Sequence, residues 1–393
     1  METTPKIVMT RPEDLVALLP YRLGFRPRDS VVLLGMCGKR LGLVSRVDLV
    51  DLAHPRRGPE ILHEVGDLMV ADGADDVFVV LYSDLPRPQL ASDPDVRSAL
   101  AHLRRLTDWA DAPGPWVVGR TDYGCWGDGE ECEPVGRDIG ELEHGEVAAT
   151  LVLHGLAVAP DRRDLAVPPT ADEGRRRAAT RAVREARGRL AAVRARCGGG
   201  AVVPGSAFGF PGSVPAVAQD EMEDWRLGEW RHWARLVATA RAGGDLAAAG
   251  LGRLAVALED NAVRDGVLCS AICEPPERVP DVDLVVQTLD LAMLPGGPSP
   301  DPRRVDAVTA VLRALVACVP ARTGGQALGL LAWIAWWTAD GARADVLAAQ
   351  ALRARPRTRL AELVDQALTH RVPPGWVRSA VGGDSTAEAA PIR

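Results

Sequence analysis

The sequence predicts an α/β N-terminal domain, built on a mixed sheet with a β-hairpin, followed by an all-α helical C-terminal domain. Three observations support this fold class. Two apolar runs enclose a polar, glycine-containing segment between residues 31 and 50, an unbroken apolar run of strand length occupies 76–82, and after residue 220 the apolar residues recur only at helical spacing. Strands mixed with helices and then helices alone are typical of two domains of different class.

The length of 393 residues is sufficient for two or three domains. We expect an α/β domain at 1–170, a basic helix with a Gly/Pro-rich linker at 171–218, a helical-bundle or helical-hairpin domain at 219–378, and a disordered tail at 379–393.

The hairpin is the clearest local signal. Val31–Leu34 and Leu41–Val50 flank Gly35–Arg40, and glycines permit the positive φ angles that a tight turn needs. Side chains alternate along a strand, so we expect Arg46 and Asp48 on one face of the second arm. A solvated ion pair is favoured for them over a ligand site, because such pairs are common on protein surfaces.

A short helix is expected before the hairpin, over Arg11–Leu19, with Thr10 as its N-cap and Pro12 at an early helical position. The segment Gly24–Ser30 then leads into the first strand, and Pro27 holds the residue before it extended.

Beyond the hairpin, helices and strands alternate through about residue 170. The patterns predict helices at 61–71, 93–110 and 145–156, and strands at 76–82 and 115–119. The run Asp76–Tyr82 is apolar on both faces, which predicts a strand covered on both sides.

The polar loop between Asp122 and Gly136 contains Cys125 and Cys132. A zinc site requires four ligands, typically with CxxC spacing, and only these two cysteines lie close together. A plain loop is therefore favoured over a metal site. The seven cysteines of the chain are irregularly spaced, which is typical of reduced intracellular thiols.

Residues Asp172–Arg196 form a predicted basic amphipathic helix, with nine arginines against three acids. Its apolar stripe at helical spacing comprises Ala179, Val183, Ala186, Leu190 and Val193. A basic helix of this kind is suited to binding an acidic protein, a phosphate backbone or a membrane surface. A docked helix with a solvated arginine face is favoured, because the chain is acidic overall and no aromatic residues interleave for base stacking.

From Asp220 onward the pattern indicates helices alone. They are expected at 220–240, at 246–268 as one helix or a broken pair, and at 281–294, 302–319, 326–338, 340–353 and 357–368. The tryptophans of the first of these helices are interpreted as core residues rather than a ligand cage. Helices of this length with short connections suggest a bundle or a solenoid of helical hairpins.

The net charge of −7 indicates solubility and lacks the basic excess of a general nucleic-acid binder. The longest apolar run, Ala327–Trp337, is too short to span a bilayer, and Met1–Thr10 lacks the apolar core of a signal peptide. These features predict a cytoplasmic protein with no membrane span.

The sequence contains no GxxxxGK[ST] loop, no dinucleotide-binding glycine pattern, no HExxH and no GxSxG. We expect no cofactor and no metal. Whether the chain is an enzyme stays open, because catalytic groups can assemble from distant positions.

Taken as a whole, the chain resembles an actinobacterial family known only as a domain of unknown function. The likeness rests on LGFRPRDSVVLLG and VSRVDL, on Val263-Arg264-Asp265 within ALEDNAVRDGVL, and on GLLAWIAWWTADGARADVLAAQAL. The family often has a WWS-like segment followed by a cysteine and CCPPEG. This chain has GCWGDGEECEPVG there, which lacks the paired cysteines. The resemblance implies a fold, a source and a cytoplasmic location, and it implies no activity.

Two functions of different class are compatible with the sequence. The favoured one is a non-enzymatic interaction or regulatory protein that binds another protein through the helical domain or the basic helix at 172–196. The alternative is an enzyme or small-ligand-binding protein with its site at the strand ends of the α/β domain, where ligands bind in open α/β sheets. The candidate residues of that site are Arg26, Asp29, Ser30, Arg46 and Asp48.

Arg264 and Asp265 are candidates under either function. Adjacent charges within an otherwise apolar helix favour a structural ion pair at the domain junction over a catalytic role.

Overall fold

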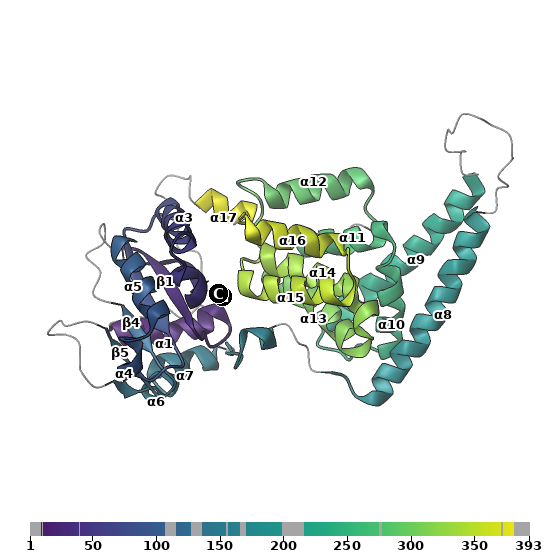
Figure 1. The fold of residues 1–393 in the computed structure, drawn as a ribbon. Helices are drawn as coiled ribbons and strands as arrows, with labels where there is room; N and C mark the ends of the chain where they lie inside the picture. The colour runs from purple at the N-terminus through teal and green to yellow at the C-terminus, as the bar shows by residue number, and fades with distance from the viewer. Residues whose placement is uncertain are drawn as a thin grey trace. The chain divides into compact units, whose positions relative to one another are not determined.

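The computed structural model of the chain describes residue 9 and residues 11–38, 40–106, 115–126, 136–154, 156–165, 170–198, 216–274, 277–370 and 372–380. The chain divides into two compact units, Met1–Leu165 with Ala380–Arg393, and Ala166–Ser379. Within the described residues, strands occur in the first unit and the second is helical (Figure 1). The predicted order of an α/β domain and an all-α domain is therefore confirmed. Most of the predicted linker and nearly all of the predicted tail lie outside the described residues.

The first unit is built on a mixed sheet. Its strands are β1 (Ser30–Cys37), β2 (Arg40–Asp48), β3 (Asp76–Tyr82), β4 (Trp116–Val118), β5 (Asp122–Cys125) and β6 (Arg137–Asp138). Their order in the sheet is β2-β1-β3-β4-β5-β6. β3 and β4 are parallel, and the other neighbours are antiparallel.

β1 and β2 form the predicted hairpin, and its turn is tighter than Gly35–Arg40. The strands stay paired as far as Cys37 and Arg40. Gly38, at the tip, has a φ of 59°, and its N–H donates to the Asp75 carboxylate at 2.9 Å. Gly35 lies inside β1 instead, where the register with β2 shifts at a bulge.

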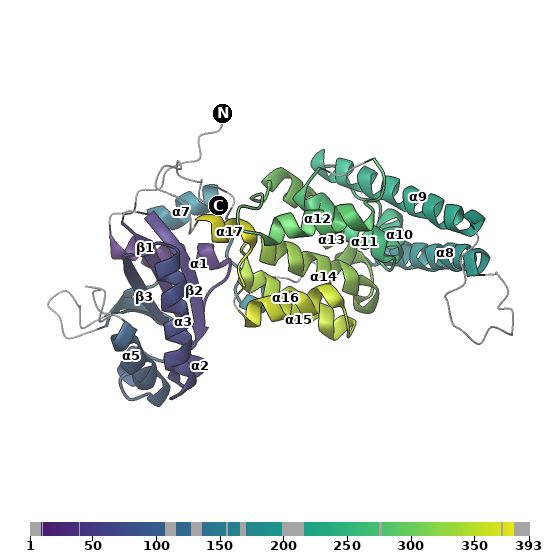
Figure 2. The same ribbon diagram turned by 90° about the horizontal axis from the view of Figure 1, so that it is seen from above.

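Helices cover both faces of the sheet, as the apolar run of β3 predicts. One face packs against α2 (Leu49–Ala53), α3 (Arg57–Ala71) and α5 (Pro94–Leu106), and Figure 2 shows α3 running along the sheet. The other face packs against α1 (Pro12–Leu23), α6 (Gly140–Glu143) and α7 (Glu146–Leu153).

Helix α1 extends past its predicted end at Leu19. It contains Pro20, continues to Leu23, and ends at Gly24, whose φ of 78° is left-handed. The helix continues because Val16 and Leu19 are buried in the sheet core, and this packing offsets the hydrogen bond that Pro20 cannot donate.

Several short elements were not predicted from the sequence. They are α2, α6, β5, β6, α4 (Arg87–Leu90) and the 3-10 helix η2 (Arg162–Leu165). Each spans only two to five residues, which is too short to show a periodic pattern.

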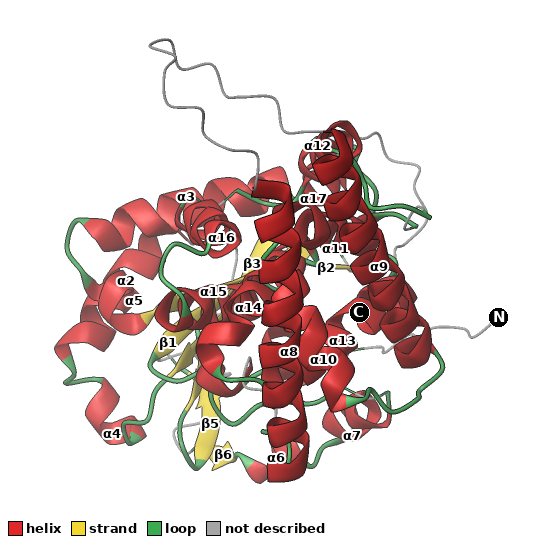
Figure 3. Cartoon of the chain, turned by 90° about the vertical axis from the view of Figure 1, so that its right-hand side faces the viewer, coloured by secondary structure: helices red, strands yellow, loops and turns green. Residues whose placement is uncertain are grey.

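The second unit consists of helices (Figure 3). They are α8 (Glu173–Gly198), α9 (Ala216–Arg241), α10 (Ala248–Ala257), α11 (Asn261–Ile272), α12 (Val282–Met293), α13 (Pro302–Cys318), α14 (Ala321–Trp337), α15 (Gly341–Ala354), α16 (Arg359–Thr369) and α17 (Gly375–Ala380). The segment 246–268 is a broken pair, because the Asp260 carboxylate accepts the N–H of Val263 and so begins a new helix.

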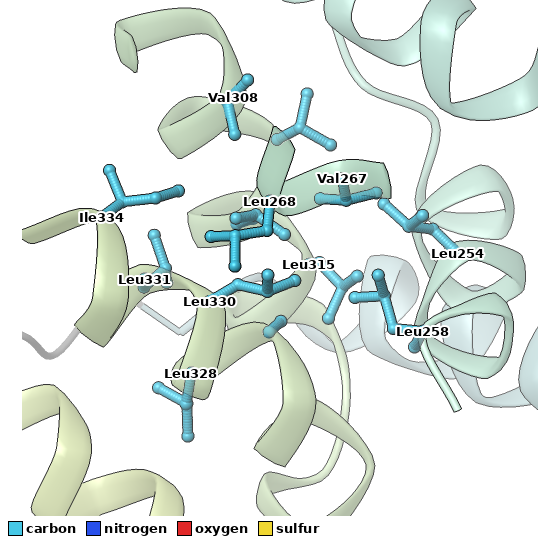
Figure 4. Close-up of a cluster of buried hydrophobic side chains, with 14 of the residues drawn as sticks. Leu254, Leu258, Val267, Leu268, Val308, Leu315, Leu328, Leu330, Leu331 and Ile334 are labelled. Atoms are coloured by element: carbon cyan, nitrogen blue, oxygen red, sulfur yellow. The ribbon is translucent and has the colours of Figure 1, made fainter. Parts of the chain in front are cut away.

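Helix α14 is central to the core of the second unit. Every residue from Gly324 to Trp337 is buried, as expected for a helix that is apolar on all sides. Leu330 and Leu331 of α14 lie near Leu268 of α11 and Leu315 of α13 in this core (Figure 4). None of the described helices combines the length and apolarity that a bilayer crossing needs.

Candidate functional site

Three polar residues form one cross-strand row where β1 begins and β2 and β3 end. Ser30 pairs with Asp48 of β2 on one side and with Tyr82 of β3 on the other. Directly paired residues point to the same face of a sheet. Tyr82 packs in the core on the α1 face, so all three belong to that face. Two candidate residues from the sequence, Ser30 and Asp48, therefore lie side by side. Tyr82, which was not a candidate, lies next to Ser30 in the same row. We call these three the strand-end row.

Two members of this row have buried hydroxyls. Ser30 is 0% exposed and Tyr82 is 4% exposed. Among the described residues, neither Ser30 Oγ nor Tyr82 Oη has a hydrogen-bond partner. A buried hydroxyl without a partner costs about 1–3 kcal/mol. Burial also raises the pKa of Tyr82, so the phenol stays protonated and remains a donor.

Arg46 brings its guanidinium to the strand-end row. Its Nη2 donates to Asp48 Oδ1 at 2.6 Å and to the Arg28 carbonyl at 3.5 Å. The guanidinium carbon lies 5.7 Å from the centre of the Phe25 ring. The predicted pair of Arg46 and Asp48 is present, but the Arg46 side chain is only 14% exposed. Its Nε is buried and finds no acceptor in the described part of the chain.

Charged residues surround this end of the sheet. Asp84, just after β3, lies 3.8 Å from Arg28 and 3.9 Å from Arg120, which follows β4. The Asp84 N–H donates to Asp29 Oδ1 at 3.3 Å, so the predicted Asp29 lies at the same end as Ser30. Sequence reasoning missed Asp84 and Arg120, although both follow strands at the edge where α/β sheets bind ligands.

The predicted candidate Arg26 makes its contacts with other elements. Its side chain forms an ion pair with Glu143 of α6, and its backbone N–H donates to the Ala159 carbonyl at 3.0 Å. These contacts tie the segment before β1 to α6 and to Ala159, and neither of them involves the strand-end row.

Arg264 and Asp265 belong to α11 in the second unit. They form an ion pair at 2.8 Å, and Arg264 Nη1 also donates to Asn261 Oδ1 at 3.0 Å. The predicted pair is present, and these contacts fix the Arg264 side chain along its own helix.

A second buried tyrosine belongs to a fully partnered network that sequence reasoning missed. Tyr123 Oη donates to Glu141 Oε2 at 3.2 Å. Arg137 pairs with Glu141 at 2.8 Å and with Glu13 at 2.6 Å, and it lies 5.4 Å from the Tyr123 ring centre. Burial raises the pKa of Tyr123 to about 12. This network ties α1 and α6 to the sheet.

The basic helix α8 is docked through its apolar stripe, all of which is buried. Several of its arginines pair with acids on neighbouring elements. Arg175 lies 2.9 Å from Asp245, and Arg187 lies 3.0 Å from Glu259. The side chain of Arg181 is exposed. This arrangement is a docked helix with a solvated arginine face.

Helix α12 has an unusually apolar exposed surface. Only Thr288 and Ala292 of the helix are buried, and it packs chiefly against α11. The exposed large apolar side chains, with their exposed fractions, are Val282 76%, Leu284 37%, Val286 51%, Leu291 56%, Met293 36% and, just past the helix, Leu294 57%.

Three of these side chains lie on the same side of α12. Val282, Val286 and Met293 are spaced four and seven residues apart, so they share one side of the helix. Asp283 and Asp290 occupy the adjacent solvent-facing side. We call Val282, Val286 and Met293 the α12 strip.

The cysteines only partly follow the prediction of reduced thiols. Cys37, Cys269, Cys273 and Cys318 are thiols. Cys125, which ends β5, is disulfide-bonded, so the prediction is wrong at this position. Cys132 lies outside the described residues. Within the described ranges, no group of three or more His, Cys, Asp or Glu side chains is arranged to hold a metal ion.

A comparison with protein families identifies the family of the chain. The family model described as "Domain of unknown function (DUF4192)" matches residues 12–375, from the start of α1 to the start of α17. Neither the curated proteins nor the solved structures contain a match to the chain.

Proposed function

Because the chain belongs to the DUF4192 family, whose description names no activity, we propose a function from the surface of the molecule. We propose that it is a non-enzymatic interaction or regulatory protein whose helical unit binds another protein along the α12 strip. An actinobacterial source and a cytoplasmic location accompany this proposal as predictions from the sequence.

The observation that supports the proposal is the exposure of the α12 strip. Val282 and Val286 are 76% and 51% exposed although they lie on one side of an ordered helix. Isolated apolar side chains are normal on a surface, but several of them exposed on one helix are typical of an interaction site. Apolar residues at helical spacing are also the anchors of helix-in-groove recognition.

The charge around α12 favours a basic amphipathic helix as the partner. Asp281, Asp283 and Asp290 are acidic, and no lysine or arginine occurs between Arg278 and Arg303. A partner with apolar side chains on one face and arginine or lysine beside them would match both features. Electrostatic complementarity of this kind selects the partner and speeds association.

A designed peptide tests this proposal. The probe is a synthetic helix of roughly twenty residues, leucine on one face and arginine on the other. Its binding to the full chain is measured by fluorescence anisotropy. We expect Val286→Ser combined with Met293→Ser to weaken binding by about tenfold or more, since each removes apolar contact area. Asp283→Asn with Asp290→Asn should weaken it chiefly at low salt.

The matched control is Val50→Ser with Val70→Ser, which alters two exposed valines of the first unit, 67% and 59% exposed. This control should bind the probe as the parent chain does. Equal binding to a probe with glutamate in place of arginine would overturn the basic partner. Self-association of the chain that disappears in the Val286→Ser, Met293→Ser variant would assign the strip to a second copy instead.

A further inference from the structure

We infer that the first unit binds the oxyanion group of a small molecule, a phosphate or a carboxylate, at Ser30, Tyr82 and Arg46. This site is distinct from the proposed protein-binding strip. The inference rests on three buried polar atoms on one face of three adjacent strands. Ser30 Oγ, Tyr82 Oη and Arg46 Nε all have no partner among the described residues.

The pairing of the strands places the backbones of these residues side by side. Ser30 lies directly opposite Tyr82, and side chains of such pairs have Cβ atoms about 4.5–5.5 Å apart. Arg46 is opposite Val32, one step further along the same face. Its guanidinium nevertheless reaches back to the row, because it bonds to Asp48, the other neighbour of Ser30.

The chemistry of the three atoms identifies the ligand class. A guanidinium Nε can only donate, and a protonated phenol and a serine hydroxyl can both donate. A ligand that accepts hydrogen bonds suits all three, and phosphate and carboxylate oxygens accept the strongest such bonds. A cation would instead be repelled by the positive charge of the Arg46 guanidinium.

Arginines near Arg46 can balance the negative charge of the ligand. Arg46 is already partly neutralised by Asp48, but Arg28 and Arg120 lie at the same end of the sheet, where each contacts Asp84 only at 3.8–3.9 Å. Such long contacts are weak, so both arginines can turn toward an incoming anion. The Phe25 ring and the Arg28 carbonyl lie against Arg46, and the segment that carries them has to shift for the anion to enter.

Calorimetric titration of the full chain with inorganic phosphate, and separately with acetate, tests the inference at constant ionic strength. The two probes distinguish a phosphate site from a carboxylate site. We expect binding of at least one probe, weakened by about tenfold or more in Tyr82→Phe and in Ser30→Ala. The bound probe should also raise the melting temperature of the parent chain but not of these variants.

Tyr123→Phe is the matched control, because it removes a buried hydroxyl whose partner is Glu141. It should retain the parent affinity for the probe. Absence of binding by both probes up to about 10 mM would overturn the inference. Binding that is equal in the parent chain, Tyr82→Phe and Ser30→Ala would overturn it as well, since the anion would then lie elsewhere.

Discussion

Tyr82 and Tyr123 are buried in the same sheet, yet only Tyr123 donates its hydroxyl to a described partner, Glu141. A sequence cannot distinguish two such tyrosines, because the difference depends on which strand lies beside each one. Arg46 was predictable as a partner of Asp48 from alternation along β2 alone. Its burial was not, since Phe25 and Arg28 reach it from a different segment.

For His232 on α9, a pH dependence of the free energy of unfolding can be predicted. Its Nε2 lies 2.9 Å from the Gly250 carbonyl. Burial lowers the pKa of His232; the bond to Gly250 and the Glu229 charge oppose this, and Arg253 and Arg235 reinforce it. In the unfolded chain the pKa is about 6.5, so the unfolded state binds the proton first as the pH falls.

The contribution of His232 to the free energy of unfolding should therefore be constant above pH about 6.5 and should fall as the pH drops from there toward the lower pKa of the folded state. Urea denaturation between pH 5 and 8, an interval of about three units around the reference pKa, measures this slope. His232→Gln keeps an N–H donor and should flatten it. His63→Gln, at a side chain that is 80% exposed, is the control for replacing a histidine. An equal flattening of the slope in both variants would contradict the assignment to His232.

At the level of elements, the sequence predicted those with a long periodic pattern. The boundaries of β3 were predicted at Asp76–Tyr82, as observed, because an apolar run bounded by polar residues defines both ends. The stripe of α8 was predicted in full for the same reason. α12 was predicted as a helix, but its exposure was not, because an apolar stripe gives no sign of whether a neighbour covers it.

The contact between α8 and α10 predicts how the replacement of a glycine changes stability. A Cβ on Gly252 of α10 would lie 2.3 Å from the backbone oxygen of Ala179 in α8. Two helix backbones cannot move apart without opening the core around them. We expect Gly252→Ala to lower the free energy of unfolding by about 1–3 kcal/mol or more, the cost of overpacking a well-packed core.

Gly188 of α8 provides the opposite case in the same pair of helices, since a Cβ there would meet no atom within 4 Å. Gly188→Ala should raise the free energy of unfolding by up to about 1 kcal/mol, because alanine favours the helix more than glycine does. Urea denaturation measures both variants. Stabilisation by both substitutions would show that the α8–α10 contact is looser than described.

At the level of the whole molecule, composition and periodicity were sufficient to predict an α/β region followed by helices. They were not sufficient for the order of the strands. β1 pairs with β3, which begins 46 positions after Ser30, and this pairing depends on packing rather than on local pattern. The strand-end row exists only because of that pairing, so Tyr82 could not be assigned to it from the sequence.

The two units have separate hydrophobic cores, and this predicts how the chain unfolds. Leu33 belongs to a core of the first unit, and Leu330 belongs to the core of the second; both are 0% exposed. Replacing either with alanine removes buried methyl groups and leaves a cavity, at a cost of about 2–5 kcal/mol.

Because compact units with their own cores unfold as separate cooperative blocks, we expect two calorimetric transitions in the full chain. Leu33→Ala should lower the midpoint of one and Leu330→Ala the midpoint of the other. If both substitutions shift one common transition, the two cores unfold together and the division into independent units is wrong.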